Sequence, residues 1–342
     1  MHAPRSGRRD SAASTASQAS LPSLAAVRGP RKGVTYARVD APMSIANVGP
    51  GFDHFGLCLD APCDRIEVWR ADTVRVEVRG DSSIPTEPER NTATIAARSF
   101  ANALGTEWTW RVRIVKGCPG GSGRGSSAAS AVGGALAAAV ALGQDPGNPK
   151  TAAAILRAAA DGEAYVSGDV HLDNVSASLF GGFTLVERTD PPIVHRLPVP
   201  PGFRAVVCLP SLRIETKAAR EVLPREVPRA DAIANVAHAS ALVRGWLSGD
   251  LEAVGRNLVD RLAEPYRSSL LPGGVAVREA AQRSGALGVA LSGSGPAIWA
   301  LARPRDAARV AAAMRRAWGA SSISARTFVA RAGTGASLVA RR

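Results

Sequence analysis

Two spacings of hydrophobic residues alternate along the chain beyond residue 33. Apolar side chains at Val74, Val76 and Val78 recur at every second position, which predicts a strand with one buried face. Other segments have helical spacing and end at glycine or proline, as at Gly143 and Pro146. Strands are expected at 34–39, 65–70, 73–78, 110–116, 182–187, 204–208, 287–291, 297–301 and 324–330, and helices at 92–104, 126–142, 151–165, 231–248, 251–262, 274–284 and 305–318.

The order of these elements favours an α+β fold. The strands at 65–70 and 73–78 predict a β-meander, and helices follow as a group, which is typical of a two-layer α+β arrangement rather than a doubly wound parallel sheet. A chain of 342 residues is long enough for roughly two domains. We place the boundary near residue 210, which predicts an N-terminal domain at 34–210 and a C-terminal domain at 211–335.

Residues 1–33 have a different composition from the rest. They are rich in Ser, Ala, Pro and Arg and have no apolar period, so we expect a disordered N-terminal tail whose deletion leaves activity and thermal stability nearly unchanged. An arginine-rich, acid-poor leader is also typical of an organelle transit peptide, which is the alternative. A secretory signal is not expected, because no apolar stretch follows the charges.

Composition excludes several classes of partner. The formal net charge is +13, but no nucleic-acid recognition motif is present and aromatic residues make up only 5%, so we expect an acidic small-molecule ligand and no nucleic acid. The longest apolar runs fall far short of the ~20 residues that span a bilayer, so no membrane association is expected. Four cysteines (Cys58, Cys63, Cys118 and Cys208) lack metal-ligand spacing and are expected to be buried thiols in a reducing compartment.

A glycine-rich segment between a predicted strand and a predicted helix is the most informative part of the chain. Gly120, Gly121, Gly123 and Gly125 allow left-handed backbone and expose N–H groups, and Ser126 is placed to cap the helix that follows. The helix dipole there favours a bound phosphate. The segment is neither a Walker A loop nor a dinucleotide fingerprint. The alternative is a flexible glycine loop before an ordinary capped helix.

Three motifs together resemble the GHMP small-molecule kinases, which include galactokinases, homoserine kinases and mevalonate kinases. They are the loop at 119–128, the segment at 42–53, and the glycine turn at 291–296. The loop departs from the usual pattern at Arg124, where the family has Leu, which puts a packing contact in doubt but no backbone phosphate donor. The resemblance implies a ribosomal-protein-S5-like N-terminal domain that binds ATP, a ferredoxin-like C-terminal domain and an active site between them, with ATP and Mg²⁺ as cofactors.

Four further segments, at 163–174, 181–183, 216–224 and 264–267, resemble the homoserine kinases within this family. That resemblance implies ATP-dependent phosphorylation of L-homoserine in threonine biosynthesis by a homodimer. It implies a cytoplasmic enzyme, or a plastid stromal one if the tail is a transit peptide. The alternatives are a GHMP kinase for another small alcohol, of the mevalonate or sugar type, and a catalytically silent ATP-binding protein.

The resemblance also implies roles for individual residues. Mg²⁺ would be held by Glu163 and Ser127, with Ser126 left as a helix cap. Asn174 occupies the position of a catalytic Asp in mevalonate and galactose relatives, so it would orient the substrate hydroxyl and no protein general base is expected. The expected catalytic residues are therefore Asn174, Glu163 and Ser127. The expected ATP-binding residues are Asn91, Pro119, Gly120, Gly121, Ser122, Gly123, Arg124, Gly125, Ser126, Ser127 and Ala128.

L-Homoserine is a zwitterion with a short hydroxylated side chain, so its site needs an acid and a carboxylate clamp. By position in the matched motifs, Asp53 and Asn47 would take the ammonium group and Arg220 and Arg267 the carboxylate. His171 and Asn174 would also contact the substrate. Residue-level alternatives remain for three positions: turn capping by His171, helix capping by Asn91 and an exposed helix-end acid at Glu163.

Overall fold

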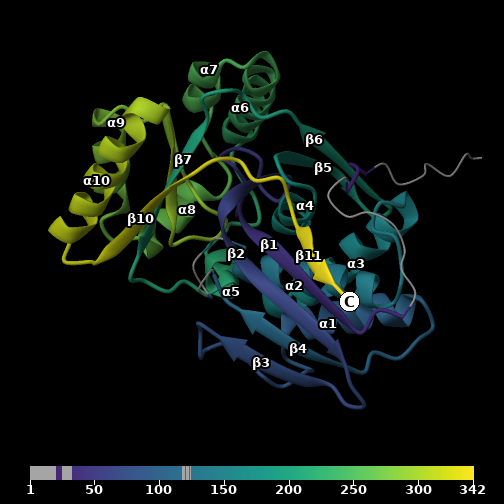
Figure 1. Cartoon of the computed structure of the whole chain (residues 1–342). Helices are drawn as coiled ribbons and strands as arrows, with labels where there is room; N and C mark the ends of the chain where they lie inside the picture. The colour runs from purple at the N-terminus through teal and green to yellow at the C-terminus, as the bar shows by residue number, and fades with distance from the viewer. Residues whose placement is uncertain (1–20, 25–32, 118–119, 121–122, 124) are drawn as a thin grey trace, which may run out of the picture.

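The computed structural model describes residues 21–24, 33–117, 120, 123 and 125–342, and it contains two sheets with helices packed against them (Figure 1). The strands are β1 (Tyr36–Ala46), β2 (Phe55–Arg70), β3 (Arg75–Arg79), β4 (Trp110–Val115), β5 (Phe183–Thr189), β6 (Pro192–Leu197), β7 (Arg204–Pro210), β8 (Gly288–Leu291), β9 (Ile298–Ala302), β10 (Ala325–Ala330) and β11 (Ser337–Arg341). The α-helices are α1 (Thr92–Ala103), α2 (Ser126–Ala141), α3 (Pro149–Ser167), α4 (Asp173–Phe180), α5 (Thr216–Glu221), α6 (Arg229–Ser248), α7 (Leu251–Arg256), α8 (Glu264–Arg267), α9 (Gly274–Arg283) and α10 (Pro304–Ala320).

The first sheet has the order β11-β1-β2-β4-β3, and β5 and β6 extend it from the start of β2. Helices α1, α2 and α3 pack together, and α2 and α4 pack on β1 and β2. Alternation along β4 explains this arrangement, because Trp110, Val112 and Ile114 are buried in the core while Arg111 points to solvent. The result is a layer of helices over one face of the sheet.

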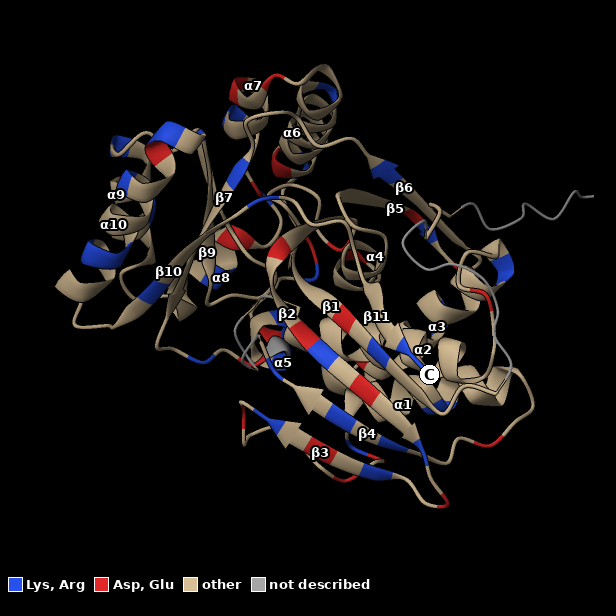
Figure 2. Ribbon diagram, in the orientation of Figure 1, with Lys and Arg blue, Asp and Glu red and all other residues tan. Residues whose placement is uncertain are grey.

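Charged residues of both signs lie along the strands of this sheet (Figure 2), and they alternate with the buried positions. Arg113 Nε lies 2.9 Å from Glu77 Oε2, and the Arg113 Nη1 atom lies 3.5 Å from Glu67 Oε2 across the neighbouring strand. Arg65 and Asp40 form a similar cross-strand pair at 2.9 Å. The acids Asp40, Glu67 and Glu77 are thus each paired with an arginine.

The second sheet has the order β10-β7-β9-β8, and all its neighbours are antiparallel. Helices α9 and α10 pack on one face. The opposite face shares a core with α6, α7 and the facing ends of β1 and β2, so this core spans both sheets. Within it the ring of Trp246 on α6 lies 4.5 Å from the ring of Phe183 on β5. This shared core fixes the two sheets relative to one another.

The α+β class is confirmed, together with most of the expected helices and strands. The expected meander is wrong: β4 lies between β2 and β3, antiparallel to β2 and parallel to β3. The alternation of apolar and polar residues at 73–78 predicts a strand with one buried face. It does not predict which strand lies next to it in the sheet. The helix expected at 251–262 ends at Arg256, and α4 lies in a segment for which no helix was expected.

The chain changes sheets between β6 and β7, and β11 returns to pair with β1. The domain boundary near residue 210 stays a prediction. No helix in the described part of the chain is both long and apolar enough to cross a membrane. Of the cysteines in the described part, Cys58 and Cys208 are buried free thiols as expected, whereas Cys63 is only partly buried; Cys118 lies outside the described residues.

Residues 21–24, which lie within the expected tail, contact the folded part of the chain. Leu24 is only 5% exposed and belongs to the core under the first sheet, and Leu21 packs against the same core. The sequence did not predict this contact, because two leucines in a polar segment form no periodic hydrophobic pattern. The remainder of the tail, residues 1–20 and 25–32, lies outside the described residues.

Because Leu24 is buried, Leu24→Ala should lower the free energy of unfolding by about 2 kcal/mol, or roughly 3 °C in Tm for a chain of 342 residues. The matched control is Leu104→Ala, since Leu104 is 43% exposed and should lose little on truncation. Thermal unfolding of both variants and of the unchanged chain measures the difference. Equal Tm values for the two variants would show that Leu24 does not contribute to the core.

Candidate active site

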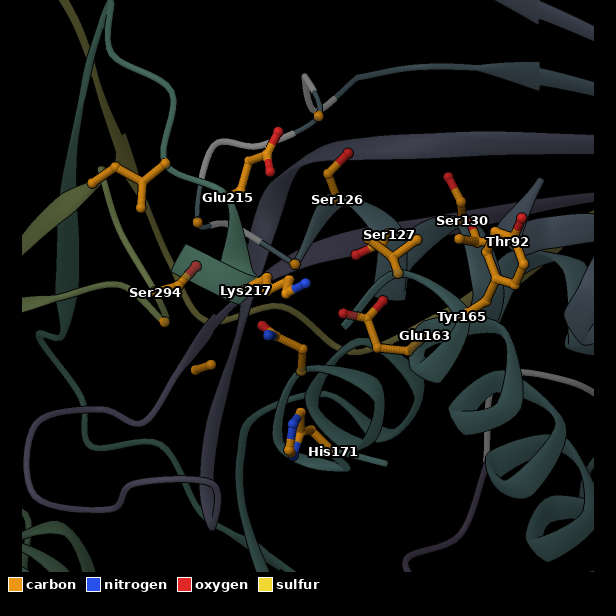
Figure 3. Close-up of a pocket in the computed structure, with 18 of the residues that line it drawn as sticks. Thr92, Ser126, Ser127, Ser130, Glu163, Tyr165, His171, Glu215, Lys217 and Ser294 are labelled. Atoms are coloured by element: carbon orange, nitrogen blue, oxygen red, sulfur yellow. The ribbon is translucent and has the colours of Figure 1, made fainter. Parts of the chain in front are cut away.

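A cavity of about 550 Å³ lies between the two halves of the molecule. The start of α2, the end of α3, the start of α4 and the helix α5 surround it (Figure 3). The expected site residues that line it are Asn47, Asp53, Gly120, Gly123, Gly125, Ser126, Ser127, Glu163, His171, Asn174, Arg220 and Arg267. Pro119, Gly121, Ser122 and Arg124 lie outside the described residues. The structure therefore brings most of the predicted residues to one place.

Two glycines of the loop before α2 are required by left-handed backbone and by close contacts. Gly123 and Gly125 both have left-handed backbone, with φ of 68° and 60°. A Cβ on Gly123 would collide with the carbonyl oxygen of Gly295, and one on Gly125 would collide with Ser44 Oγ. Ser292 Oγ also donates a hydrogen bond to Gly123 O at 2.6 Å. As expected, the glycine turn at 291–296 packs beside this loop.

The beginning of α2 presents main-chain N–H groups without a side-chain cap. The N-cap is Gly125, so the expectation that Ser126 caps this helix is wrong, and Ser126 is its first helical residue. The residues that follow, Ser127 and Ala128 among them, are small. An uncapped helix start with a positive dipole end and small side chains fits an anion such as a phosphate.

A buried ion pair ties both ends of the loop to the sheet. Lys116, at the end of β4, contacts the Asp64 carboxylate of β2 and donates to Ser126 O at 3.0 Å and Ser130 Oγ at 2.9 Å. Asp64 in turn accepts from Gly117 N at 3.0 Å. The Lys116 and Asp64 side chains are 2% and 0% exposed. Lys116 lines the cavity, yet its charge is already neutralised.

Glu163 on α3 lies beside Ser127 on α2, and both line the cavity (Figure 3). Burial raises the pKa of Glu163 to about 7, a hydrogen bond with Ser127 opposes the rise, and the nearby Asp173 carboxyl adds to it. A carboxyl held with a hydroxyl in a partly buried site fits Mg²⁺, which prefers oxygen ligands and keeps several waters. The described residues hold no group of three His, Cys, Asp or Glu side chains that could bind a metal ion.

Asn174 lies in the first turn of α4, with its side-chain oxygen accepting from Ser44 Oγ at 2.8 Å. This bond fixes the amide orientation and leaves its nitrogen as the donor group. The neighbouring Asp173 is 3% exposed, and its carboxylate accepts from Asn174 N at 2.7 Å. Burial raises the pKa of Asp173 to about 7, and the charge of Asp53 adds to the rise. An amide, not a base, therefore stands at this position.

Asp53 forms an ion pair across the two halves of the molecule. Arg220 on α5 donates to Asp53 Oδ1 at 3.0 Å and to Oδ2 at 3.3 Å. The ring nitrogen Nδ1 of His171 lies 3.8 Å from Asp53, and burial lowers the pKa of His171. Asn47 supports the acid, because its side-chain oxygen accepts from Asp53 N at 3.1 Å. A negative and a positive group thus stand side by side in the cavity.

Arg267 is more deeply buried than Arg220, and its hydrogen bonds go to main-chain carbonyl oxygens. It is 3% exposed, and it donates to the carbonyl oxygens of Ala219 at 2.9 Å and Gly293 at 3.1 Å. Its guanidinium lies 5.4 Å from the ring of Phe52, and that of Arg220 lies 5.6 Å from the same ring. Arg267 therefore holds α5 against the glycine turn, and its role as a carboxylate ligand stays a prediction.

Asn91 caps α1. Its side-chain oxygen accepts from Ala93 N at 3.1 Å and Thr94 N at 3.4 Å, and its nitrogen donates to Pro85 O at 2.8 Å. The residue is 1% exposed. Both ends of the amide are in use, which favours the capping role over a direct contact with adenine.

Several residues around the cavity carried no assigned role in the sequence prediction. They are Ser44, Asp64, Lys116, Ser130, Asp173 and Lys217. Asp173 and Lys217 both stand inside matched motifs, and Asp173 is next to Asn174, so membership of a matched motif was a usable signal. No local signal pairs Asp64 with Lys116, because strand pairing brings them together from 52 residues apart.

Comparisons with known proteins agree on one family. The family model for the GHMP kinases N terminal domain matches residues 91–182, and that for the GHMP kinases C terminal matches residues 239–320. The chain is 44% identical over 299 residues to a homoserine kinase of Pyrococcus furiosus, covering 87% of this chain and 99% of that one. It is 40% identical over 304 residues to a homoserine kinase of Halobacterium salinarum, covering 88% and 96%.

Solved structures give the same picture. A homoserine kinase from Cytophaga hutchinsonii superimposes with a TM-score of 0.83 at 35% identity, covering 90% of this chain and 99% of that one. A mevalonate diphosphate decarboxylase from Staphylococcus aureus has a TM-score of 0.65 at 12% identity, covering 90% and 98%. The second likeness shows a shared fold alone.

Gly125→Ala should weaken ATP binding strongly while lowering thermal stability only as much as a control glycine substitution does. The new methyl group would displace Ser44 and would lie 2.7 Å from Asn174 Oδ1. Gly105→Ala is the matched control, because Gly105 has a similar φ of 66° and no atom within 4 Å of the added Cβ. Both variants should lose about 1–2 kcal/mol of unfolding free energy because alanine is strained in left-handed backbone, and both should therefore show a similar decrease in Tm. Calorimetric titration with ATP should show weakened binding for Gly125→Ala only; equal binding by the two variants would contradict the cradle.

Glu163→Gln should stabilise the protein in the absence of nucleotide and Mg²⁺, and more so at pH 8 than at pH 5. The pKa of Glu163 is raised to about 7 in the folded state, while an unfolded glutamate loses its proton near pH 4. Folding therefore becomes less favourable as pH rises from about 4 to about 7, and Gln removes this loss. Measurements of Tm at both pH values test this expectation, and Glu226→Gln is the exposed control. An increase in Tm that is equal at both pH values would contradict a raised pKa for Glu163.

Proposed function

The chain belongs to the homoserine kinases of the GHMP kinase family, and we propose that its cavity transfers the γ-phosphate of ATP to the side-chain hydroxyl of L-homoserine. The product is O-phospho-L-homoserine, an intermediate of threonine biosynthesis. One observation carries the choice of acceptor: the Asp53–Arg220 ion pair at 3.0 Å lies in the same cavity as Asn174 and the phosphate loop.

An α-amino acid is the natural complement of that ion pair. Its ammonium group can replace Arg220 beside Asp53, and its carboxylate can replace Asp53 beside Arg220, so no charge is left unpaired when substrate binds. Asn47 and His171 flank Asp53 and complete the ammonium side of the site. A mevalonate or sugar acceptor has no ammonium group and would leave Asp53 without this partner, which disfavours the closest alternative.

ATP fits the loop before α2. The left-handed glycines, the uncapped start of α2 and the small residues behind it allow close approach of the phosphates. Glu163 and Ser127 would hold Mg²⁺, which when bound neutralises phosphate charge and aligns the transfer. Lys116 holds both ends of the loop in place, and its charge is neutralised by Asp64 and not by the ligand.

Asn174 orients the acceptor. Because Ser44 fixes the amide oxygen, the amide nitrogen is left to donate to the hydroxyl oxygen of homoserine. An amide cannot take a proton, so the hydroxyl proton leaves with the transferred phosphoryl group or to solvent. Positioning and charge neutralisation therefore provide the rate enhancement, as is general for phosphoryl transfer.

Compartment and assembly are also proposals. The free thiols of Cys58, Cys63 and Cys208 fit a reducing compartment such as the cytoplasm. A homodimer is proposed on the family resemblance alone. Sedimentation of the purified chain would measure the assembly directly.

A panel of acceptors tests the proposed function. ADP release should be rapid with L-homoserine and near background with mevalonate, galactose and shikimate. Failure with homoserine together with turnover of another alcohol would assign a different acceptor to this fold. No turnover with any of them, despite ATP binding, would favour a silent ATP-binding protein.

Arg220→Ala should lower kcat/KM for homoserine by roughly 30- to 1,000-fold, because a charge-assisted pair in a half-buried site is worth roughly 2–4 kcal/mol. ATP binding should change little. Arg225→Ala, at an exposed position outside the cavity, is the matched control. Weakened ATP binding with an unchanged KM for homoserine would instead assign Arg220 to the nucleotide.

Asn174→Asp should slow turnover at least tenfold, since a carboxylate at this position repels the γ-phosphate and adds to the charge of Asp173. Asn174→Ala removes only the orienting amide and separates loss of orientation from repulsion. Steady-state kinetics over pH 5.5–9 measure both variants. A faster Asn174→Asp enzyme with a new acidic limb would show that a general base is useful here.

A further inference from the structure

Helix α5 carries two basic residues toward the cavity, and the proposed function uses only one of them. Arg220 pairs with Asp53, whereas Lys217 lies one turn earlier on the same short helix and also lines the cavity. Figure 3 shows its ammonium group directed toward the space between Ser127 and Glu163, opposite the start of α2. Lys217 therefore stands on the phosphate side of the cavity.

Two other basic groups that line the cavity are already neutralised or bonded. Lys116 is held by Asp64, Ser126 and Ser130, and Arg267 donates to two carbonyl oxygens. Lys217, in contrast, forms no ion pair with any residue in the described part of the chain. A lysine directed into a cavity without an acidic partner is poised for an anionic ligand.

We propose that Lys217 is a catalytic residue that binds the γ-phosphate of ATP and stays with the phosphoryl group during transfer. This proposal rests on the proposed function of the cavity. The bond between the γ-phosphorus and the β–γ bridging oxygen breaks, and its electron pair leaves with ADP. A bond forms between the same phosphorus and the homoserine hydroxyl oxygen, whose proton passes to the phosphoryl group or to solvent. Lys217 remains protonated throughout.

The position of Lys217 on α5 also connects the phosphate side of the cavity to the amino-acid side. Because Lys217 and Arg220 are three residues apart on one helix, the helix that contacts the amino acid also contacts the phosphate. Movement of α5 toward the cavity would bring both contacts together. The carboxylate of the substrate is not the target of Lys217, since Arg220 beside Asp53 already provides that site.

Binding without turnover is the first test. Calorimetric titration of the full chain with ATP and with ADP, both with Mg²⁺, gives the ratio of the two affinities. Lys217→Met should reduce the preference for ATP over ADP roughly 10- to 100-fold, because only ATP has the γ-phosphate. Lys217→Arg should keep most of the preference. Lys150→Met, at the exposed start of α3 and about 20 Å along that helix from Glu163, is the matched control for loss of one lysine charge.

Kinetics supply the second readout. Lys217→Met should lower kcat for homoserine by about 100-fold or more while KM for homoserine changes less than threefold. An unchanged ATP-to-ADP ratio, or a loss confined to KM for homoserine, would overturn the proposal. Absence of homoserine turnover in the unchanged chain would instead overturn the proposed function, and the affinity ratio would still report on Lys217. Near-equal Tm values for the variants exclude misfolding as the cause.

Discussion

The buried Lys116–Asp64 pair is the interaction on which the geometry of the site depends. It joins the end of β4 to the middle of β2, and through Ser126 and Ser130 it also holds the first turn of α2. Because Gly117 bonds to the same carboxylate, both ends of the glycine loop are attached to one point of the sheet. Two desolvated charges are costly on their own, so this pair is stable only with its full set of hydrogen bonds.

From this fixed loop the site extends into the C-terminal half. The glycine turn contacts the loop at Gly123, Arg267 attaches α5 to that turn, and α5 brings Arg220 to Asp53. The shared core of the two sheets keeps these contacts in register. One half therefore provides the glycine loop and Asp53, while the other provides Arg220 and Lys217, which complete the cavity.

Sequence reasoning assigned the glycine loop, Glu163 with Ser127, and Asn174 to one site, and they line one cavity; each was found because it belongs to a motif with local spacing. It placed Arg220 and Asp53 at one substrate but not against each other, since 167 residues separate them and only tertiary packing joins them. It missed the order of β3 and β4 and the burial of Leu24 for the same reason. The N-cap at Gly125 was missed by one residue, because Ser is usually the better cap and the loop geometry overrides that preference.

The central claim is that this cavity joins the γ-phosphate of ATP to the side-chain oxygen of a zwitterionic amino acid. Phosphorus NMR of the chain incubated with ATP, Mg²⁺ and L-homoserine observes that bond directly. The account predicts that the γ-phosphate signal of ATP gives way to a phosphomonoester signal split by the adjacent methylene protons. Conversion of the γ-phosphate to inorganic phosphate alone, with no phosphomonoester signal, would contradict it.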